Sequence, residues 1–247
     1  MFDLVVSSLR KLALRLLLVV IIITGAAVVA IGVARAEDQQ VDANVITALD
    51  VSTSINAVET ILQVEGMADA VRSPAFVAAA SQGRHGRIGF LVFVWADGNY
   101  PELVSWRVVG TQAEANAVSV EIQSKLQSLI QAAPRGVGTL TNISGALEHA
   151  NQLVQEAPFR AERDVVNIIG NGEDNVGEDP QRARAALLAM GVTVNGVVVG
   201  GDPDVLRYFR TFVVGGKGAF TLTIGRAEDL TTMMVSKFVA DLAMVTD

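Results

Sequence analysis

The chain has 247 residues, no cysteine and a formal charge of −7. The absence of cysteine excludes disulfides and thiolate metal sites. An acidic chain without a basic stripe repels phosphate backbones, so we expect no nucleic-acid partner.

The first segment combines a basic flank with a long apolar run. Three basic residues precede a nearly unbroken apolar stretch over residues 16–34, and Ala34-Arg35-Ala36 has the small-x-small pattern of a signal-peptidase site. We therefore expect residues 1–36 to be a signal peptide or a membrane anchor, followed by a short linker over 37–42. The basic flank stays cytoplasmic. The rest is then periplasmic or secreted, and it is held at the inner membrane only if the segment stays uncleaved.

The remainder is more acidic than the whole chain. Residues 1–36 contain four basic side chains and one acidic side chain, contributing +3, so residues 37–247 carry −10. These 211 residues suffice for one domain with a sizeable core. We expect that domain to cover residues 43–247.

Short apolar segments alternate with helical patterns along this domain, which is typical of a parallel sheet covered by helices on both faces. The predicted strands are Asn44–Asp50, Ile88–Ala96, Leu103–Val109, Asp164–Gly170, Thr193–Val199 and Phe220–Ile224. The predicted helices lie near Ala57–Val71, Ala113–Ala132, Ile143–Glu156, Pro180–Met190, Pro203–Val213 and Ala227–Val245. A five-residue link before Leu103 indicates a hairpin. The predicted fold is α/β, Rossmann-like and doubly wound, with a mostly parallel six-stranded sheet and one antiparallel edge strand.

Oxygen donors follow the first predicted strand. The segment Asp50-Val51-Ser52-Thr53-Ser54 ends a buried apolar run with one carboxylate and hydroxyls at alternate positions. Mg²⁺ prefers such oxygen ligands. The alternative is that Ser52 or Ser54 only caps the following helix.

Two further polar loops follow buried elements. The segment 139–147 places a hydroxyl cluster at the start of an amphipathic helix, and the strand ending at Gly170 continues into Asn171-Gly172-Glu173-Asp174. In an open sheet of this kind, ligands gather outside the carboxyl ends of the strands, at the switch in winding order. We expect the three loops to meet there.

Three polar loops in this order resemble the von Willebrand factor type A domain, over roughly Asp42 to Asp247, and most closely a bacterial exported branch without an assigned function. The resemblance implies a metal-ion-dependent adhesion site, which takes Asp-x-Ser-x-Ser from a first loop, Thr from a second and usually Asp from a third. The matching residues here are Asp50, Ser52, Ser54, Thr141 and Asn171. Thr139 is the reserve candidate in the second loop.

The third loop departs from the family pattern. It reads Gly170-Asn171-Gly172 where the family has Thr- or Gly-Asp-Gly. Asn offers a neutral carbonyl oxygen, so Asp50 alone supplies charge against a divalent cation, which weakens retention. Glu173 or Asp174 restores charge if the loop bends inward, and otherwise the two belong to a solvated acidic loop.

The resemblance implies a binding module that holds Mg²⁺, with Mn²⁺ or Ca²⁺ as alternatives, and captures an Asp or Glu of an unknown exported or envelope protein. We do not expect an enzyme. An aspartyl phosphatase needs a second acid two residues after its nucleophile, and Ser52 holds that place. A third possibility is an interaction domain that has the same fold but a degenerate, metal-free site, and Asn171 is the first sign of such degeneration.

Four conspicuous side chains lie outside the candidate loops. We expect His85, in a turn-like setting, and His149, on a helix face, to be structural or surface residues, because no nearby His or Cys completes a metal pattern. We expect Trp95 and Trp106 to cover the sheet edge beside the hairpin.

Overall fold

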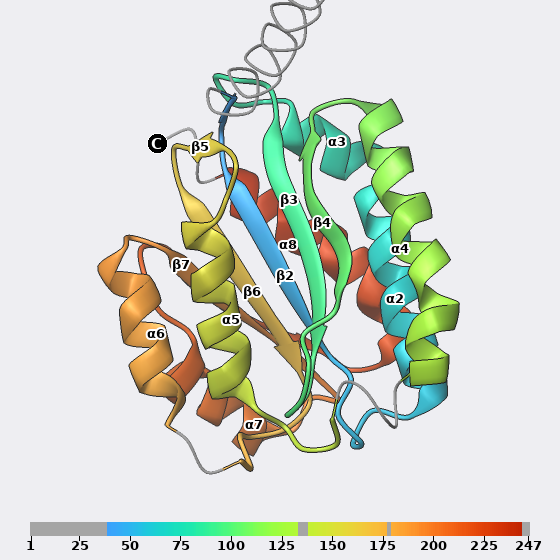
Figure 1. Ribbon diagram of the computed structural model, residues 1–247, viewed down its shortest axis with the longest axis vertical. Helices are drawn as coiled ribbons and strands as arrows, with labels where there is room; N and C mark the ends of the chain where they lie inside the picture. Colours follow the sequence, from blue (N-terminus) through green and yellow to red (C-terminus); the bar gives the residue numbers. More distant parts are fainter. Residues whose placement is uncertain (1–38, 133–137, 177–178, 244–247) are drawn as a thin grey trace, which may run out of the picture. The chain divides into compact units, whose positions relative to one another are not determined.

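A computed structural model describes residues 39–132, 138–176 and 179–243, and the folded unit begins at Gln40 (Figure 1). The predicted leader over residues 1–36 and its cleavage pattern lie outside the described residues. Within the described ranges, no helix is both long enough and apolar enough to cross a membrane.

A six-stranded sheet forms the centre of the fold. Its strands are β2 (Asn44–Asp50), β3 (Ile88–Trp95), β4 (Glu102–Val109), β6 (Asp164–Gly170), β7 (Thr193–Val199) and β8 (Thr221–Ile224). They lie in the order β4-β3-β2-β6-β7-β8, and all pairs are parallel except β3 with β4. The sequence prediction of a mostly parallel sheet with one antiparallel edge strand is therefore confirmed.

Helices cover both faces of this sheet, as predicted (Figure 1). On one face lie α2 (Ala57–Val71), α3 (Pro74–Ala80), α4 (Gln112–Ala132) and α8 (Leu230–Ala243). On the other face lie α5 (Ile143–Gln155), α6 (Pro180–Ala189), α7 (Pro203–Tyr208) and a π-helical turn (Phe209–Val213) that continues α7. A 3-10 turn (Ala227–Asp229) precedes α8. The predicted last two residues of that helix, 244 and 245, lie outside the described residues.

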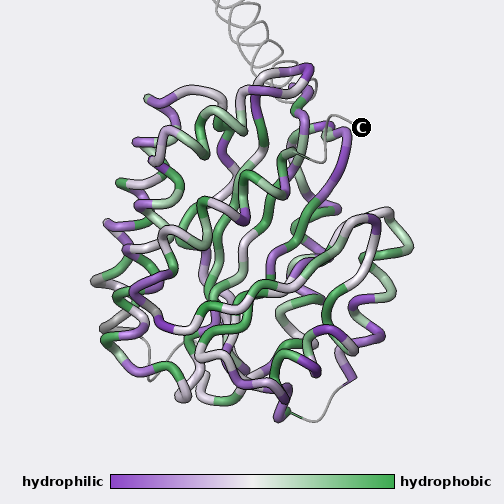
Figure 2. Tube along the Cα trace, turned by 180° about the vertical axis from the view of Figure 1, so that it is seen from behind, coloured by the Kyte–Doolittle hydropathy of each residue, from purple (hydrophilic) through white to green (hydrophobic). Residues whose placement is uncertain are grey.

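Alternate residues of each strand supply the two cores, because successive side chains of a strand point to opposite faces. In β2, Val45 and Leu49 pack with α2, α3, α4 and α8, whereas Ile46 and Ala48 pack with α5 and α6. Figure 2 shows the central strands as mainly hydrophobic and the connecting loops as mainly hydrophilic. Both faces of β2 are therefore buried, and only its two ends are left for polar chemistry.

Three elements, α3, β1 (Gln40–Val41) and β5 (Arg160–Ala161), have no counterpart in the prediction. Helix α3 is capped by Ser73 and has Pro74 in its first turn, but it is only seven residues long. A two-stranded parallel sheet joins β1 to β5. Val41 is fully buried. Gln40 and Val41, assigned from sequence to a linker, thus belong to the folded unit.

A buried polar network fastens α8 to the sheet. The Lys237 ammonium donates to both carboxylate oxygens of Asp241 at 2.6 Å, and both residues are fully buried. Asn167 of β6 and Asn195 of β7 donate to the same carboxylate at 3.1 and 3.0 Å. A buried charge pair needs such additional hydrogen bonds to offset its desolvation. The network lies in the middle of the sheet, away from its carboxyl edge.

Candidate functional site

Three loops meet at the carboxyl edge of the sheet, where the arrowheads of β2 and β6 lie side by side (Figure 1). The first loop follows β2, the second precedes α5, and the third follows β6. Strand order runs from β2 to β3 and β4 on one side and to β6, β7 and β8 on the other. The switch in winding therefore falls between β2 and β6, where doubly wound sheets bind their ligands.

Four of the predicted site residues form a continuous chain of oxygen atoms. The Ser52 and Ser54 hydroxyls are 3.0 Å apart, and the Ser54 hydroxyl donates to Asn171 Oδ1 at 2.7 Å. The Thr141 hydroxyl donates to Ser52 Oγ at 3.3 Å. Side chains from all three loops are thus in direct contact. Ser52 and Thr141 are buried, whereas Ser54 is exposed, so the chain leads from the interior to the surface.

Asp50, the fifth predicted residue, lies beneath this chain at the end of β2. It is fully buried, and its Oδ1 accepts a hydrogen bond from the Ser52 backbone at 2.8 Å. Its Oδ2 has no hydrogen-bond partner among the described residues. Burial raises the pKa of Asp50 to about 6, although the backbone and side chain of Ser52 and the backbone of Asn171 oppose the rise. A buried carboxylate with an unpartnered oxygen is unfavourable unless another group satisfies it.

Gly170 makes room for this carboxylate. A Cβ at position 170 would lie 3.2 Å from Asp50 Oδ2 and 3.3 Å from the Trp95 ring. These separations are tighter than ordinary van der Waals contact, so a larger residue would press on the carboxylate. The first glycine of the family pattern, Gly170 here, is therefore favoured because a side chain at this position would collide with Asp50 and Trp95.

The capping alternative for Ser52 and Ser54 is wrong. Helix α2 is capped by Asn56, whose side chain accepts hydrogen bonds from the Val58 and Glu59 backbones. Glu59 in turn accepts from the Asn56 backbone, which completes a capping box. The two serine hydroxyls are consequently not needed at the helix start.

The second loop presents Thr141, whereas Thr139 is exposed and takes part through its backbone. The carbonyl of Thr139 accepts hydrogen bonds from the Thr53 amide at 3.0 Å and the Thr53 hydroxyl at 2.8 Å. The Thr141 amide donates to Asn175 of the third loop at 2.8 Å. The second loop is therefore tied to both of its neighbours, with Thr141 directed at Ser52.

Asp97 positions the second loop and was not predicted from sequence. Its Oδ1 accepts hydrogen bonds from the Thr139 and Leu140 backbones, the latter at 2.9 Å. These bonds, that from Leu140 foremost, lower the pKa of Asp97. Its place in an Asp-Gly pair two residues after β3 is a turn signal, but its partners lie more than 40 residues away in the sequence.

The acidic third loop does not bend toward Asp50. Both carboxylate oxygens of Asp174 are occupied, because Oδ2 accepts from the Ser144 amide at 3.0 Å and Oδ1 from the Val176 amide at 3.1 Å. Asp174 thereby holds the start of α5. Glu173 is exposed. Asp50 is the single carboxylate of the five-residue cluster, and Asn171 keeps the place of the missing acid.

The four conspicuous side chains have separate positions. His149 stacks on Tyr100 with ring centroids 4.9 Å apart, and burial lowers its pKa, in keeping with a structural role. Trp106 packs edge-on against Phe159 on the edge strand, as expected. The expectation for Trp95 is wrong, because this residue is fully buried beneath the site, beside Gly170. His85 lies at the opposite edge of the sheet, 3.4 Å from Glu162.

The donor set fits a hard divalent cation. It offers one carboxylate, three hydroxyls and one amide oxygen, all of the oxygen type that Mg²⁺, Mn²⁺ and Ca²⁺ prefer. The unpartnered Asp50 Oδ2 is the atom that such a cation would satisfy, directly or through water. The imidazoles of His85 and His149 take no part in this cluster.

Solved structures share the fold. Proximal thread matrix protein 1 (PTMP1) from the mussel byssus, with a zinc occupied MIDAS motif, matches with a TM-score of 0.56 and 23% identity over 84% of this chain and 49% of that chain. A von Willebrand factor type A protein from Catenulispora acidiphila matches with a TM-score of 0.57 and 14% identity over 81% of this chain and 42% of that chain. The chain thus spans about half the length of these structures.

A third match is the von Willebrand factor domain of the type V pili tip protein Mfa5 from Porphyromonas gingivalis, with a TM-score of 0.55 and 8% identity over 84% of this chain and 97% of that domain. The predicted resemblance to the von Willebrand factor type A fold is confirmed. No curated protein matches the sequence. One family model covers residues 40–246, and by that match the chain belongs to the family described as "Protein of unknown function (DUF1194)".

Proposed function

We propose that this chain is an exported, divalent-cation-dependent protein-binding module. Asp50, Ser52, Ser54, Thr141 and Asn171 hold the cation, which is Mg²⁺, or Mn²⁺ or Ca²⁺ in its place. One observation carries the proposal: a buried carboxylate with an unpartnered oxygen lies under a chain of four side-chain oxygens from three separate loops. Packing alone gives no reason to gather these groups at a strand end.

The low charge of the donor set favours capture of an anionic group. With one carboxylate against two positive charges, the bound cation keeps a net positive charge and, when bound, supplies an open coordination position for an incoming carboxylate. Ser54 is exposed and Asn171 half-buried, so that position faces solvent. We propose that an Asp or Glu side chain of a partner completes the coordination.

Apolar side chains on the second and third loops and at the start of α2 support a protein partner. Val58 at the start of α2, Leu140 in the second loop and Val176 in the third loop are 65%, 44% and 39% exposed. They are three of the six large hydrophobic residues that are exposed in the described part of the chain. Protein interfaces combine such apolar groups with a few polar anchors. A carboxylate flanked by neutral or basic groups suits this surface, because the −10 charge of residues 37–247 repels acidic neighbours.

We further propose binding rather than catalysis, in the periplasm or outside the cell, with an exported or envelope protein as partner. Hydrolysis through a serine would require a base beside it. His149 is stacked on Tyr100 and His85 lies beyond the other end of β2. The place of the second acid of an aspartyl phosphatase is occupied by Ser52, whose hydroxyl is bonded within the cluster.

The first prediction is that the full chain binds Mg²⁺ and that Asp50→Ala lowers the Mg²⁺ affinity at least tenfold. Isothermal titration of chelator-treated protein measures it. Asp69→Asn, which changes an exposed carboxylate of α2, is the matched control and keeps the parent affinity. Equal Mg²⁺ affinity in the Asp50→Ala variant and the control would contradict the proposal, and absence of binding in the parent would leave the degenerate-site reading.

Asn171→Asp is expected to tighten Mg²⁺ binding, by about tenfold or more. An Asp at this position still accepts from the Ser54 hydroxyl, and it adds a second negative charge. It loses the donor bond from the amide nitrogen to the Ser54 carbonyl, which is only 3.3 Å long. The same titration gives the result. Unchanged affinity would place Asn171 outside the coordination sphere.

Without metal, Asp50→Asn is expected to stabilise the protein at pH 7, by about 1–3 kcal/mol. The folded-state pKa of about 6 lies above the ordinary value of 3.8, so the ionised carboxylate opposes folding at neutral pH. The parent recovers this stability as the pH falls from about 6 to about 4, and the difference between the two proteins shrinks. Urea unfolding at pH 7 and pH 4 in chelator measures it. A stability difference between the two proteins that grows from pH 7 to pH 4 would contradict the prediction that the ionised Asp50 opposes folding.

Partner capture is expected to require both the cation and the apolar surface. Protein retained from an envelope extract should be released by chelator, lost with Asp50→Ala and weakened several-fold by Leu140→Ser. Met190→Ser, at an exposed hydrophobic residue that ends α6, is the matched control and leaves retention unchanged. Retention that ignores both chelator and Asp50→Ala would refute the adhesion-site mechanism while leaving the fold intact.

A further inference from the structure

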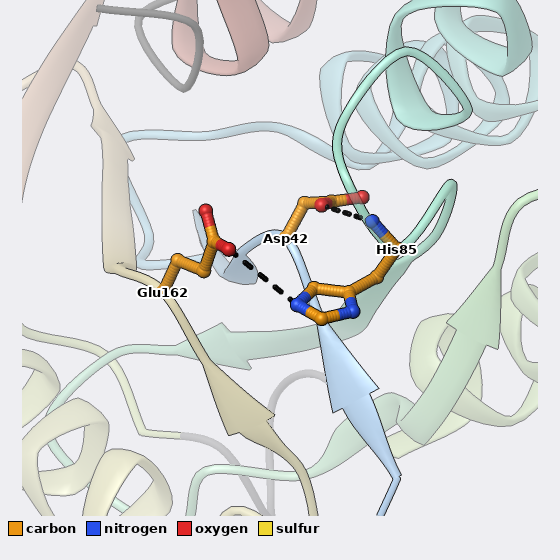
Figure 3. A group of neighbouring side chains, drawn as sticks. All are labelled: Asp42, His85 and Glu162. Carbon is orange, nitrogen blue, oxygen red and sulfur yellow. Dashed lines mark hydrogen bonds and ion pairs between the residues drawn. The ribbon is translucent and has the colours of Figure 1, made fainter.

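A second cluster of ligand-type side chains lies at the opposite edge of the sheet. Asp42 precedes β2, His85 precedes β3 and Glu162 precedes β6, and these three strands are neighbours. One ligand atom from each side chain lies within 4.8 Å of the other two. Figure 3 shows the Glu162 carboxylate directed at the imidazole and the Asp42 carboxylate beside the His85 backbone nitrogen. Sequence reasoning missed this cluster, because it treated His85 as a structural or surface residue.

The backbone holds Asp42 and the His85 turn together. Asp42 Oδ1 accepts from the His85 amide at 2.7 Å and Oδ2 from the Arg87 amide at 3.1 Å, while the Asp42 amide donates to the Arg87 carbonyl at 2.9 Å. A Cβ at Gly83 would lie 2.1 Å from Asp42 Cγ, so glycine is required for this approach. Asp42 is almost completely buried. Its orientation is thus fixed before any ligand arrives.

Glu162 is placed by the small β1–β5 sheet. Gln40 pairs with Arg160 and Val41 with Ala161, and the Glu162 amide donates to the Val41 carbonyl at 3.3 Å. The side chain of Glu162 is 40% exposed and can adjust, whereas that of His85 is 17% exposed. The cluster therefore combines a fixed carboxylate, a largely enclosed imidazole and one adjustable carboxylate.

The distance between His85 and Glu162 suits two ligands of a four-coordinate metal, and the Asp42 ligand atom lies within 4.8 Å of both. His85 Nε2 lies 3.4 Å from Glu162 Oε1. Two ligands of a tetrahedral zinc, with bonds of about 2.0–2.2 Å, are about 3.3–3.5 Å apart. Each Asp42 oxygen accepts one backbone hydrogen bond, and an ionised carboxylate has about four acceptor positions in all, so a metal bond can be added without breaking the clamp. Such backbone donors orient a metal ligand from behind.

Charge and donor type point to a borderline transition metal. Two carboxylates and a neutral imidazole balance the charge of a divalent ion. Arg87, the neighbouring cation, is not a ligand in this site, and its guanidinium donates to the Gln40 carbonyl at 3.1 Å. Zn²⁺ takes imidazole nitrogen together with carboxylate oxygen, whereas Mg²⁺ prefers oxygen ligands throughout.

We propose that Asp42, His85 and Glu162 bind Zn²⁺, with water or a further ligand in the fourth position. The site is separate from the Asp50 cluster, because the two lie at opposite ends of β2, roughly 25 Å apart at about 3.3 Å per residue. It ties three segments that precede neighbouring strands, which are β1, the turn of residues 83–87 and β5. The proposal does not rest on the proposed function.

The test uses the full chain, purified without a histidine tag, with Asp50→Ala as background so that zinc has no access to the carboxyl-edge cluster through Asp50. Isothermal titration should give one Zn²⁺ per chain, and saturating Zn²⁺ should raise the thermal unfolding midpoint. Adding Glu162→Gln or His85→Gln should weaken binding at least tenfold. Adding His149→Gln, which changes the other histidine, should leave it unchanged. Co²⁺ in place of Zn²⁺ should show the strong visible absorption of a four-coordinate ion.

These variants avoid Asp42, whose carboxylate also clamps the turn and whose loss would confuse unfolding with loss of a ligand. Glu162→Gln with Asp50 intact should bind Mg²⁺ like the parent, which separates the two sites. Zinc affinity that is unchanged by both Glu162→Gln and His85→Gln would overturn the proposal. So would the absence of bound zinc in the Asp50→Ala protein, which would leave a simple His85–Glu162 ion pair.

Discussion

The register of β2 between β3 and β6 is the constraint on which both polar clusters depend. All seven residues of β2 are buried, and the strand is paired in parallel along its whole length on one side and nearly so on the other. Parallel strands in register bring like ends together. The residues that follow β2 and β6 therefore meet at one edge, and the residues that precede β2, β3 and β6 meet at the other. A shift of one residue would turn Asp50 to the opposite face of the sheet and dismantle the oxygen cluster.

The carboxyl edge stores an unfavourable electrostatic state. Asp50 is buried with an unpartnered oxygen, and burial raises its pKa. Hydrogen bonds hold the neighbouring loops: the Leu140 amide of the second loop donates to Asp97, and the Ser144 amide at the start of α5 donates to Asp174. Hydrogen-bonded support around a buried charged group is a feature of ligand sites. Asn171 adds no charge to the cluster, so in the proposed function the cation would be held less tightly and would keep more positive charge for an anionic ligand.

Sequence patterns predict the parts of this molecule that depend on neighbours in the chain. The six strands and the antiparallel edge follow from apolar runs and a short link, and the Asp50 and Asn171 loops follow from polar residues at strand ends. Contacts between distant segments are not encoded locally. The β1–β5 pair has two residues per strand, too few for a pattern. The His85–Glu162 contact joins residues 77 apart, and Trp95 lies under the site because β3 pairs with β2 at Asp50.

Two clusters of different donor chemistry on one sheet would sort cations by type. Zn²⁺ binds N and O ligands more strongly than Mn²⁺, and far more strongly than Mg²⁺, so affinity alone would let it enter either cluster. The imidazole and the second carboxylate make the amino-edge cluster the stronger competitor for zinc, because the carboxyl-edge cluster offers only one charge and neutral oxygens. If both proposals hold, zinc would be held by Asp42, His85 and Glu162, and the hard cation would be left for Asp50. Asp42 is hydrogen-bonded to the His85 turn and precedes β2, and β2 ends at Asp50. The same strand therefore connects the proposed zinc site to the oxygen cluster at the carboxyl edge.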